Sequence, residues 1–304
     1  MATSGSYDYS VNRNEVIAAA LRKCGVQSIS STDYADAAVA LNLMIKHWAI
    51  QDFKLWAQKE VVLFLVPGTQ SYTVGPSGNN AAYTFVEAEV GTAYASGTAL
   101  VLDSTTGMTA ADYIGVELDS GTMQWRTITT VDSATQVTLS SALSSAAAAG
   151  NTVYTYTSKP QRPMEIMNIR HYVDDREVPI APASRKEYLE LTNKTTEGMP
   201  VQVYYQPTLT NGTVYVWPTS SDPADTLKFT AKIQLQDMDL QTNDFDFPQE
   251  WHRALVWNLA AEIMGEYGIP PEDRMEIQAK ADQYLNDCLD YDSESASVFF
   301  SPGY

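Results

Sequence analysis

Apolar residues recur every three or four positions at both ends of the chain, which is the spacing of one helix face. Near the N-terminus this spacing predicts a short helix over 14–24, ended by Gly25, because glycine most readily adopts the left-handed conformation of a helix end. A second, long amphipathic helix is predicted over 34–48, with Ser31 or Thr32 as its N-cap. We therefore expect the N-terminal region to be helical.

The same spacing returns near the C-terminus. Residues 246–267 begin with N-terminal helix signals and carry apolar groups on nearly all sides, so we expect a centrally buried helix. After a turn at 270–271, the apolar stripe from Ile277 to Cys288 predicts another helix with acidic residues on its other faces. Residues 293–304 lack a helical period and are expected to form an extended tail.

Between these helical regions the apolar period changes to two, which predicts β-strands. A capping box of Ser184 and Glu187 predicts one short helix among them, and the pair Asn211-Gly212 predicts a tight hairpin. The strands expected here lie near 57–66, 72–74, 166–173, 177–180, 201–205, 213–217 and 226–235. Those after residue 160 predict a small antiparallel meander.

A stretch of different composition, 84–157, interrupts this region. It is rich in Thr, Ser, Ala and Val and lies between a break at 76–80 and another at 159–160. Six short strands are expected in it, at 85–90, 99–102, 114–118, 124–128, 136–139 and 153–156, with 146–150 as a loop. The sequence thus predicts an α+β fold: a helical core domain with a small antiparallel β meander (1–80 and 158–292), an inserted all-β module (84–157) and a C-terminal tail (293–304).

Composition narrows the class of protein. Two distant cysteines and three isolated histidines argue against a disulfide framework and a structural zinc site. No unbroken apolar run is longer than that of 61–66, which is far shorter than the ~20 residues of a membrane helix, and residues 1–10 have no leader pattern. We therefore expect a soluble chain with no membrane partner, no metal and no cofactor.

The net charge of −18 is spread unevenly over the 304 residues. Residues 1–60 and 158–236 are neutral overall, whereas 61–157 carry a net −6 and 237–304 a net −12. A protein that grips DNA presents a basic patch that displaces counterions from the phosphates, and neither acidic block offers one. The charge therefore argues against a grip on DNA, and it is compatible with nearby DNA that does not adhere to the protein.

Motifs that would anchor an enzymatic function are missing, because there is no glycine-rich nucleotide loop, no HExxH and no nucleophile elbow. Neither His171 nor His252 has a neighbouring nucleophile in the sequence, so both are expected to be structural. Carboxylate pairs suit glycoside hydrolysis or a divalent ion, and the candidates are Asp237 with Asp239 and Asp244 with Asp246. With 37 acidic residues such pairs arise by chance, and we predict that the protein is not an enzyme.

Several short motifs follow one another in a characteristic order. They are 41–42, 44–46, 55–56, 162–166, 179–180, 184–188, 194–200, 203–205, 212–218, 247–251, 254–255, 257–260 and 266–268. Together they resemble the head-to-tail adaptor family of short-tailed bacteriophages, whose members are also called tail accessory or head-completion proteins. The resemblance covers roughly the whole chain outside 84–157. Its core and signature positions are Trp48, Trp56, Arg162, Trp217, Trp251 and Trp257.

This resemblance implies a structural protein of the virion, located at the head-tail junction and present in the host cytoplasm during assembly. It implies a ring of about twelve copies that docks under the portal protein and extends the DNA channel. The ring would then serve as the platform for a tail nozzle or tail needle protein. The role of the inserted module is not implied by the family pattern.

The chemistry of the tail indicates that it binds a partner, and the resemblance implies that this partner is the portal protein. Residues 293–304 carry one charge, Glu294, and their apolar groups are costly to leave in water: Val298, Phe299, Phe300 and Tyr304. Burying large apolar side chains gains roughly 1.5–3 kcal/mol each, which offsets the ordering of a few residues. We expect the tail to bind the portal protein as an extended peptide.

Two other classes of function are alternatives to an assembly protein. The inserted module is a candidate glycan- or receptor-binding module, in which Tyr94, Tyr113 and Trp125 would supply the aromatic contacts. A peptidoglycan hydrolase would instead need two carboxylates that converge in a cleft.

Overall fold

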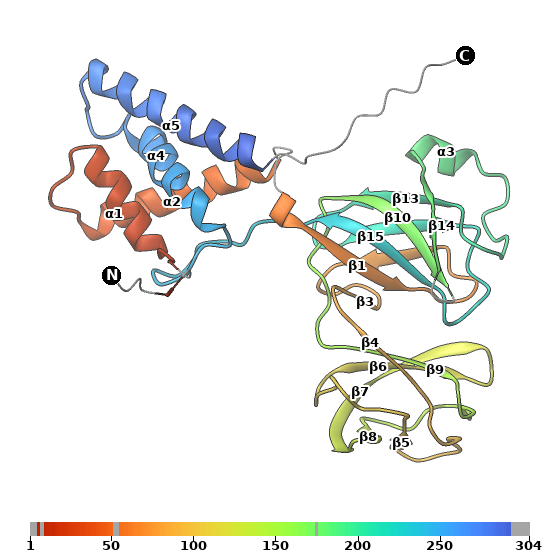
Figure 1. Ribbon diagram of the computed structural model, residues 1–304. Helices are drawn as coiled ribbons and strands as arrows, with labels where there is room; N and C mark the ends of the chain where they lie inside the picture. Colours follow the sequence, from red (N-terminus) through yellow and green to blue (C-terminus); the bar gives the residue numbers. More distant parts are fainter. Residues whose placement is uncertain (1–4, 7–8, 51–54, 174–175, 293–304) are drawn as a thin grey trace. The chain divides into compact units, whose positions relative to one another are not determined.

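The computed structural model describes residues 5–6, 9–50, 55–173 and 176–292 (Figure 1). They form a mixed α+β structure, which confirms the predicted fold class. The chain divides into two compact units, a helical unit from the described residues of 1–57 and 235–304 and a β-rich unit from those of 58–234. The predicted domain boundaries at 84 and 157 lie within the β-rich unit.

The helical unit contains all four helices that the apolar spacing predicts. They are α1 (Arg13–Lys23), α2 (Ser31–Ile50), α4 (His252–Ile263) and α5 (Pro271–Tyr291), with short 3-10 turns η1 (Leu55–Ala57) and η2 (Gln249–Trp251). Asn12 and Glu15 form a capping box at the start of α1. Ser30 and Asp33 exchange the equivalent hydrogen bonds before α2, one residue earlier than the predicted cap.

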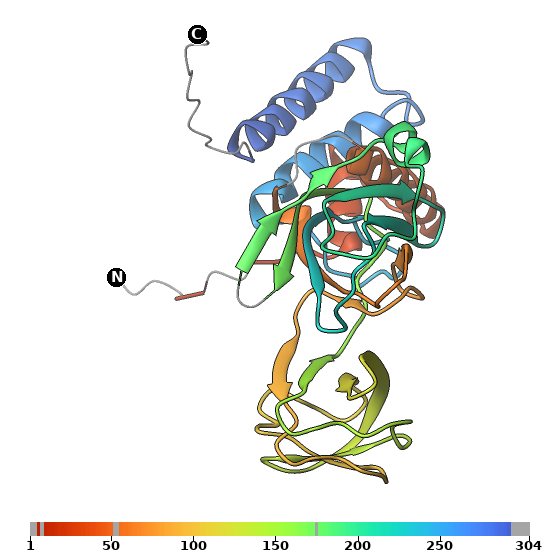
Figure 2. The ribbon, with the colours of Figure 1, turned by 90° about the vertical axis from the view of Figure 1, so that its right-hand side faces the viewer.

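The centrally buried helix is α4, which contacts α1, α2 and α5. α5 runs alongside it in both views (Figure 2). α4 ends at Ile263, four residues before the predicted Tyr267, because the chain turns toward α5 through two glycines, Gly265 and Gly268. Gly268 has a φ of +62°, a conformation that glycine adopts without strain.

The β-rich unit holds two sheets of the host region. The five-stranded sheet has the order β11-β10-β15-β1-β3, with β1 (Gln58–Phe64), β3 (Ala81–Ala82), β10 (Glu165–Val173), β11 (Arg176–Pro179) and β15 (Thr226–Lys232). The four-stranded sheet has the order β12-β13-β14-β2, with β2 (Ser71–Val74), β12 (Ala181–Pro182), β13 (Gln202–Pro207) and β14 (Gly212–Trp217). The short helix α3 (Arg185–Glu190) starts at the predicted Ser184–Glu187 capping box.

The strands after residue 160 therefore do not form the single meander that the sequence predicts. They are shared between two sheets, because β15 pairs with β1 and β14 pairs with β2. The strands β1 and β2 both precede the inserted module in the sequence. β12 pairs parallel to β13, whereas the predicted meander is antiparallel throughout. Residue periodicity predicts a strand but carries no information about its partner.

The hairpin β13–β14 forms where predicted, but with a longer turn. Pro207 pairs with Gly212, so the connection is the four residues 208–211 rather than Asn211-Gly212 alone. Gly212 opens β14 beneath the ring of Tyr205, where a Cβ atom would lie 2.0 Å from the tyrosine oxygen. This glycine is required by the close approach of a ring and not by the turn.

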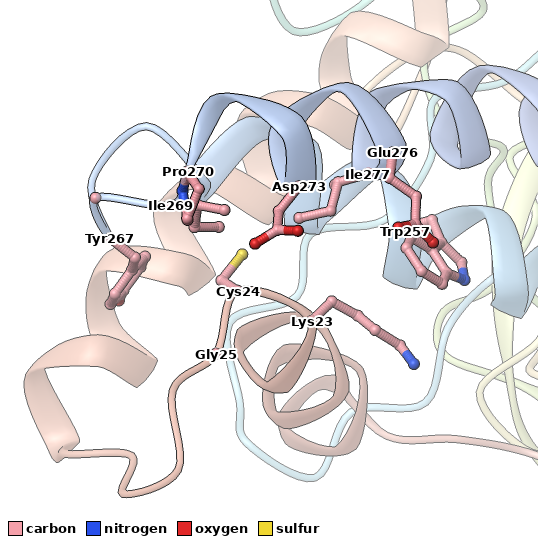
Figure 3. Close-up of a pocket in the computed structure, with 11 residues that line it drawn as sticks. Lys23, Cys24, Gly25, Trp257, Tyr267, Ile269, Pro270, Asp273, Glu276 and Ile277 are labelled. Atoms are coloured by element: carbon pink, nitrogen blue, oxygen red, sulfur yellow. The ribbon is translucent and has the colours of Figure 1, made fainter.

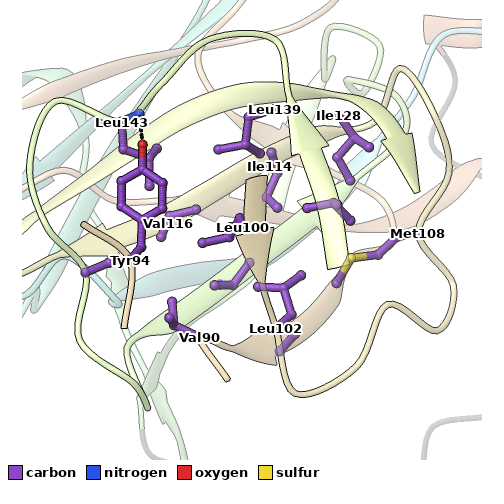
Figure 4. Packing of buried hydrophobic residues seen from close by; sticks show 14 of the residues in the cluster. Val90, Tyr94, Leu100, Leu102, Met108, Ile114, Val116, Ile128, Leu139 and Leu143 are labelled. Atoms are coloured by element: carbon purple, nitrogen blue, oxygen red, sulfur yellow. Dashed lines mark hydrogen bonds between the residues drawn. The ribbon is translucent and has the colours of Figure 1, made fainter. Parts of the chain in front are cut away.

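The inserted module contains the six predicted strands in the order β4-β9-β6-β7-β8-β5. Their bounds are β4 (Val86–Glu89), β5 (Ala99–Val101), β6 (Tyr113–Leu118), β7 (Thr122–Ser133), β8 (Gln136–Leu139) and β9 (Thr152–Tyr156). The two edge strands meet, because Val90 bridges Leu102 and the Gly91 N–H donates to the Val101 carbonyl at 3.0 Å. The sheet thus curls into a barrel-like closure around its own apolar core (Figure 4).

Candidate functional site

Three of the signature tryptophans meet in one aromatic cluster of the helical unit. Trp48 of α2 and Trp56 of η1 lie 5.9 and 6.2 Å from Trp251, measured between ring centroids. Phe247 completes the cluster at 5.0 Å from Trp56 and 6.0 Å from Trp251. These four rings join residues from both ends of the chain, which explains why the N- and C-terminal motifs occur together.

Two polar residues of the N-terminal motif also hold a distant segment. The side chain of Asn42 accepts from the Met238 N–H at 2.9 Å and donates to the Met238 carbonyl at 3.2 Å. One turn further along α2, the ammonium of Lys46 donates to the Leu235 carbonyl at 2.7 Å and pairs with Asp237 at 2.5 Å. The motif 41–46 therefore fixes residues 235–238 along α2.

Trp257 lies apart from the aromatic cluster, in a groove between α1, α4 and the start of α5 (Figure 3). The groove has a volume of about 340 Å³, and its floor includes the buried side chains of Cys24, Ile269 and Ile277. Lys23 stands on the α1 wall, with its ammonium 5.0 Å from the Trp257 ring centroid. This groove, called the Trp257 groove below, is apolar at its base and charged along its walls.

Burial and hydrogen bonds shift the pKa values of titratable groups in and near this groove. Desolvation raises the pKa of the Cys24 thiol to about 11, so the group is a neutral thiol at neutral pH. Tyr267 donates its hydroxyl proton to Asp33 at 3.0 Å, and burial together with this bond raises the pKa of the tyrosine to about 12. Hydrogen bonds from Ser30 hold the pKa of Asp33 below its usual value. The carboxylate therefore stays charged and the phenol neutral.

The two remaining signature residues belong to the β-rich unit. The indole N–H of Trp217 donates to the Asn193 carbonyl at 2.8 Å. Arg162 precedes β10, and its positive charge opposes the rise in the pKa of Tyr205 that burial causes. Trp217 and Arg162 therefore belong to a different unit from the aromatic cluster.

The predicted portal-binding residues Val298, Phe299, Phe300 and Tyr304 lie outside the described residues. Their role stays a prediction from the sequence.

The aromatic residues proposed for glycan binding have structural roles. Tyr94 is 5% exposed in the module core, where it donates to the Gly97 carbonyl and accepts from the Leu143 N–H at 3.0 Å (Figure 4). Tyr113 and Trp125 pack beneath the module against the host region. All three rings are thus used in packing, Tyr94 as a buried side chain and Tyr113 and Trp125 as half-buried ones.

Tyr113 and Trp125 belong to a joint that the sequence analysis missed. Phe64 of β1 lies 5.0 Å from both Trp125 and Tyr154 and 5.8 Å from Tyr156, measured between ring centroids. The Tyr154 hydroxyl donates to the Ala224 carbonyl at 2.9 Å, outside the module. The available signal was the unbroken apolar run 61–66, since such a strand is buried on both faces. We call this cluster the module joint.

Two of the four carboxylates considered for catalysis are engaged in other contacts. Asp237 pairs with Lys46, and Asp239 accepts from the Asn243 side chain at 2.7 Å. Across the described part of the chain, no group of three or more His, Cys, Asp or Glu side chains is arranged to hold a metal ion.

His171 belongs to a buried polar pair. Its Nε2 atom lies 3.0 Å from Asp225, and the two side chains are 3% and 6% exposed. The Ser220 hydroxyl donates to the same carboxylate at 2.6 Å. Because the serine bonds the aspartate and not the histidine, the order differs from that of a nucleophilic triad. His252, in contrast, is half-buried beside Tyr9.

No helix among the described residues is long and apolar enough to span a membrane.

Comparison with known proteins places this architecture in one family. No curated protein matches the chain. The family model of the SU10 adaptor protein matches residues 122–299, from the first residue of β7 through both C-terminal helices. The match includes three module strands, the host strands after them and the Trp251 side of the aromatic cluster. It covers more than half of the sequence, and the chain therefore belongs to the SU10 adaptor protein family.

Proposed function

We propose that this protein is the head-to-tail adaptor of a phage virion and forms a ring between the portal protein and the tail. The observation that carries this proposal is the family match over 122–299. Family membership identifies an adaptor, and the ring of about twelve copies, the DNA channel and the two neighbouring proteins are the finer content of the proposal. Its location is the head-tail junction, reached by assembly in the host cytoplasm.

The charge of the chain supports the channel role. A ring multiplies the net charge of −18, and a wall with an excess of acids repels phosphates instead of neutralising them. DNA can then slide through the channel during packaging and ejection without adhering to it. The structural role also agrees with the engagement of Asp237 and Asp239 in local contacts.

The C-terminal tail is the proposed portal anchor. Val298, Phe299, Phe300 and Tyr304 follow a helix dense in acids, and an extended apolar peptide repeated around a ring gives many weak contacts that act together. The proposed partner on the opposite side of the ring is the tail nozzle or tail needle protein.

Co-sedimentation with purified portal rings tests this function. We expect the full chain to sediment with the rings and the chain truncated after Asp292 to remain folded but unbound. A second truncation, after Ser297, keeps the first part of the tail and removes only its apolar end. If the apolar side chains make the contact, this truncation should abolish docking as well. Docking of both truncated chains at the level of the full chain would refute the tail anchor, and failure of the full chain to dock would refute the adaptor role.

A further inference from the structure

The outward face of α2 carries an apolar stripe. Val39, Leu43 and Ile50 are 61%, 66% and 73% exposed. A helix turns by about 100° per residue, so these three positions lie within one narrow sector of the helix surface. The opposite side of α2 is buried within its own unit, which leaves the stripe facing away from that core. We call these three residues the α2 stripe.

The α2 stripe is convex, the Trp257 groove is concave, and both belong to the helical unit. The stripe is a convex row of aliphatic side chains, whereas the groove is a concavity of about 340 Å³ with Trp257 on its wall and Ile277 in its floor. A half-buried tryptophan is a frequent energetic centre of a protein interface. Its neighbours Lys23 and Lys280 lie 5.0 and 4.8 Å from the ring centroid.

The charges that flank the two surfaces are also complementary. The helical spacing places Asp36 on one flank of the stripe and Lys46 on the other, and Lys46 keeps 43% of its side chain exposed while it pairs with Asp237. The groove has Lys23 on its α1 wall and exposed Asp273 on its α5 wall (Figure 3). Asp36 and Lys23 carry opposite charges, as do Lys46 and Asp273, so opposite charges flank the two surfaces.

We infer that the α2 stripe of one copy docks into the Trp257 groove of the next copy, which makes this pair of surfaces the contact between neighbouring subunits. This inference rests on the proposed function, because the ring supplies the second copy. Two different surfaces on one subunit form a head-to-tail contact, and such contacts close into rings.

The size of the stripe explains why the contact needs a template. Its three side chains expose on the order of 300 Å² of apolar area, against roughly 800 Å² per partner in a stable complex. One contact alone is too small to hold a dimer at ordinary concentrations. Copies that are aligned side by side on a portal ring gain it as an added, nearly intramolecular interaction.

Cross-linking between two single-cysteine variants tests this contact. One variant carries Leu43→Cys and the other Asp273→Cys, both in a background with Cys24→Ala and Cys288→Ala, and a short bismaleimide is added after docking on portal rings. We expect cross-linked dimers in the mixture of both variants and at least tenfold less in either variant alone. Leu209→Cys, which replaces a 96% exposed leucine of the β-rich unit, is the matched control in the mixture with Asp273→Cys.

Each outcome of this experiment either supports or overturns the contact between the α2 stripe and the Trp257 groove. Dimers from Leu43→Cys alone would show that α2 meets α2 and would overturn the inference, as would equal yields from the Leu209→Cys control. Docked variants without cross-links overturn it while the proposed function stands. If the wild-type chain fails to dock on portal rings, the proposed function fails. The contact is then tested by itself with the same mixture of variants at high protein concentration and without portal. Absence of mixed dimers there overturns the inference.

Discussion

At the scale of single residues, His171 and Asp225 form a buried polar pair in the β-rich unit. His171 lies on β10, and Asp225 immediately precedes β15, the neighbouring strand of the same sheet. The backbone carbonyl of Asp225 also accepts from the Leu65 N–H at 3.0 Å, just after β1. One aspartate thus links three segments that are distant in the sequence.

Asp225→Ala should lower the free energy of unfolding of the β-rich unit by about 1–3 kcal/mol, because it removes the buried carboxylate that faces His171 and accepts from the Ser220 hydroxyl. Asp222→Ala, at an exposed position in the same loop, is the control and should cost less than about 1 kcal/mol. The double variant His171→Leu with Asp225→Ala should lose clearly less than the sum of the two single variants. Denaturant unfolding is measured for the wild type and the four variants, including His171→Leu alone, and a loss under about 1 kcal/mol in Asp225→Ala would contradict this account.

The tyrosines of the module joint make stability depend on alkaline pH. Burial raises the pKa of Tyr154 and of Tyr156 above the ordinary value of 10. Above about pH 10 the unfolded chain releases phenolic protons that the folded chain retains, so the free energy of unfolding falls as pH rises. Below that pH the contribution is fully present.

We therefore expect the double variant Tyr154→Phe with Tyr156→Phe to lose less stability between about pH 8 and about pH 11 than the wild type does. Tyr291→Phe, which changes a 75% exposed ring, should behave as the wild type. Denaturant unfolding at the two pH values gives the comparison, and an unchanged pH dependence in the double variant would show that the joint tyrosines are not protected from ionisation.

At the scale of elements, β1 connects the host sheet with the inserted module. Successive side chains of β1 point to opposite faces of the sheet. The last four residues of the strand, Val61 to Phe64, are all buried, so both faces are covered. Val62 and Phe64 belong to the module joint. The module therefore covers apolar surface of the host in addition to enclosing a core of its own.

Replacing 84–157 by a short Gly-Ser linker should leave a chain that folds and docks on portal rings, as expected for a separable insertion, but the structure adds a condition. Removal of the module exposes Val62 and Phe64, so the shortened chain should aggregate more than the wild type. The shortened chain that also carries Val62→Thr and Phe64→Thr should stay monomeric. Light scattering and portal co-sedimentation check both variants, and loss of folding in the second would show that the module is part of the host core.

The sequence predicts elements better than their partners. The period of three to four residues locates α1, α2, α4 and α5, and the period of two locates all six module strands, because both periods are local properties. Closure of the module through Val90 and Leu102 and the distribution of host strands over two sheets depend on contacts between distant residues. Those contacts leave no periodic trace.

For the candidate site too, the sequence predicts which residues matter better than it predicts which residues meet. The order of motifs indicates that Trp48, Trp56 and Trp251 matter, but their meeting in one cluster emerges only in three dimensions. Phe64 and Tyr154 carry no motif at all, and their role in the joint was therefore missed. The packing of Tyr94, Tyr113 and Trp125 could not be predicted for a related reason, because an aromatic residue in a β module has the same appearance in sequence whether its ring is exposed or packed.

For the whole molecule, charge is expected to govern assembly. With −18 on each copy, neighbours repel each other until a partner aligns them or salt screens them. The free protein should therefore be largely monomeric at low and at physiological salt. Multi-angle light scattering measures this directly, and a stable ring at low salt without portal would contradict the electrostatic argument.

The same charge predicts weak contact with DNA. Non-specific affinity grows with the number of phosphates that a protein neutralises, and an acidic ring neutralises few. Duplex DNA should bind more weakly than about 10 μM at physiological salt. Fluorescence anisotropy with labelled duplex gives the value, and tighter binding would mean that the channel wall grips its cargo.

The central claim is that this chain forms a ring on the portal, and imaging of purified portal rings incubated with the full-length protein tests it most directly. Electron cryomicroscopy should show an added ring of about twelve subunits on one face of the portal, coaxial with its channel, in which each subunit contains a helical unit and a β-rich unit. Portal rings that remain bare at saturating protein, or density that lies away from the channel axis, would contradict the account.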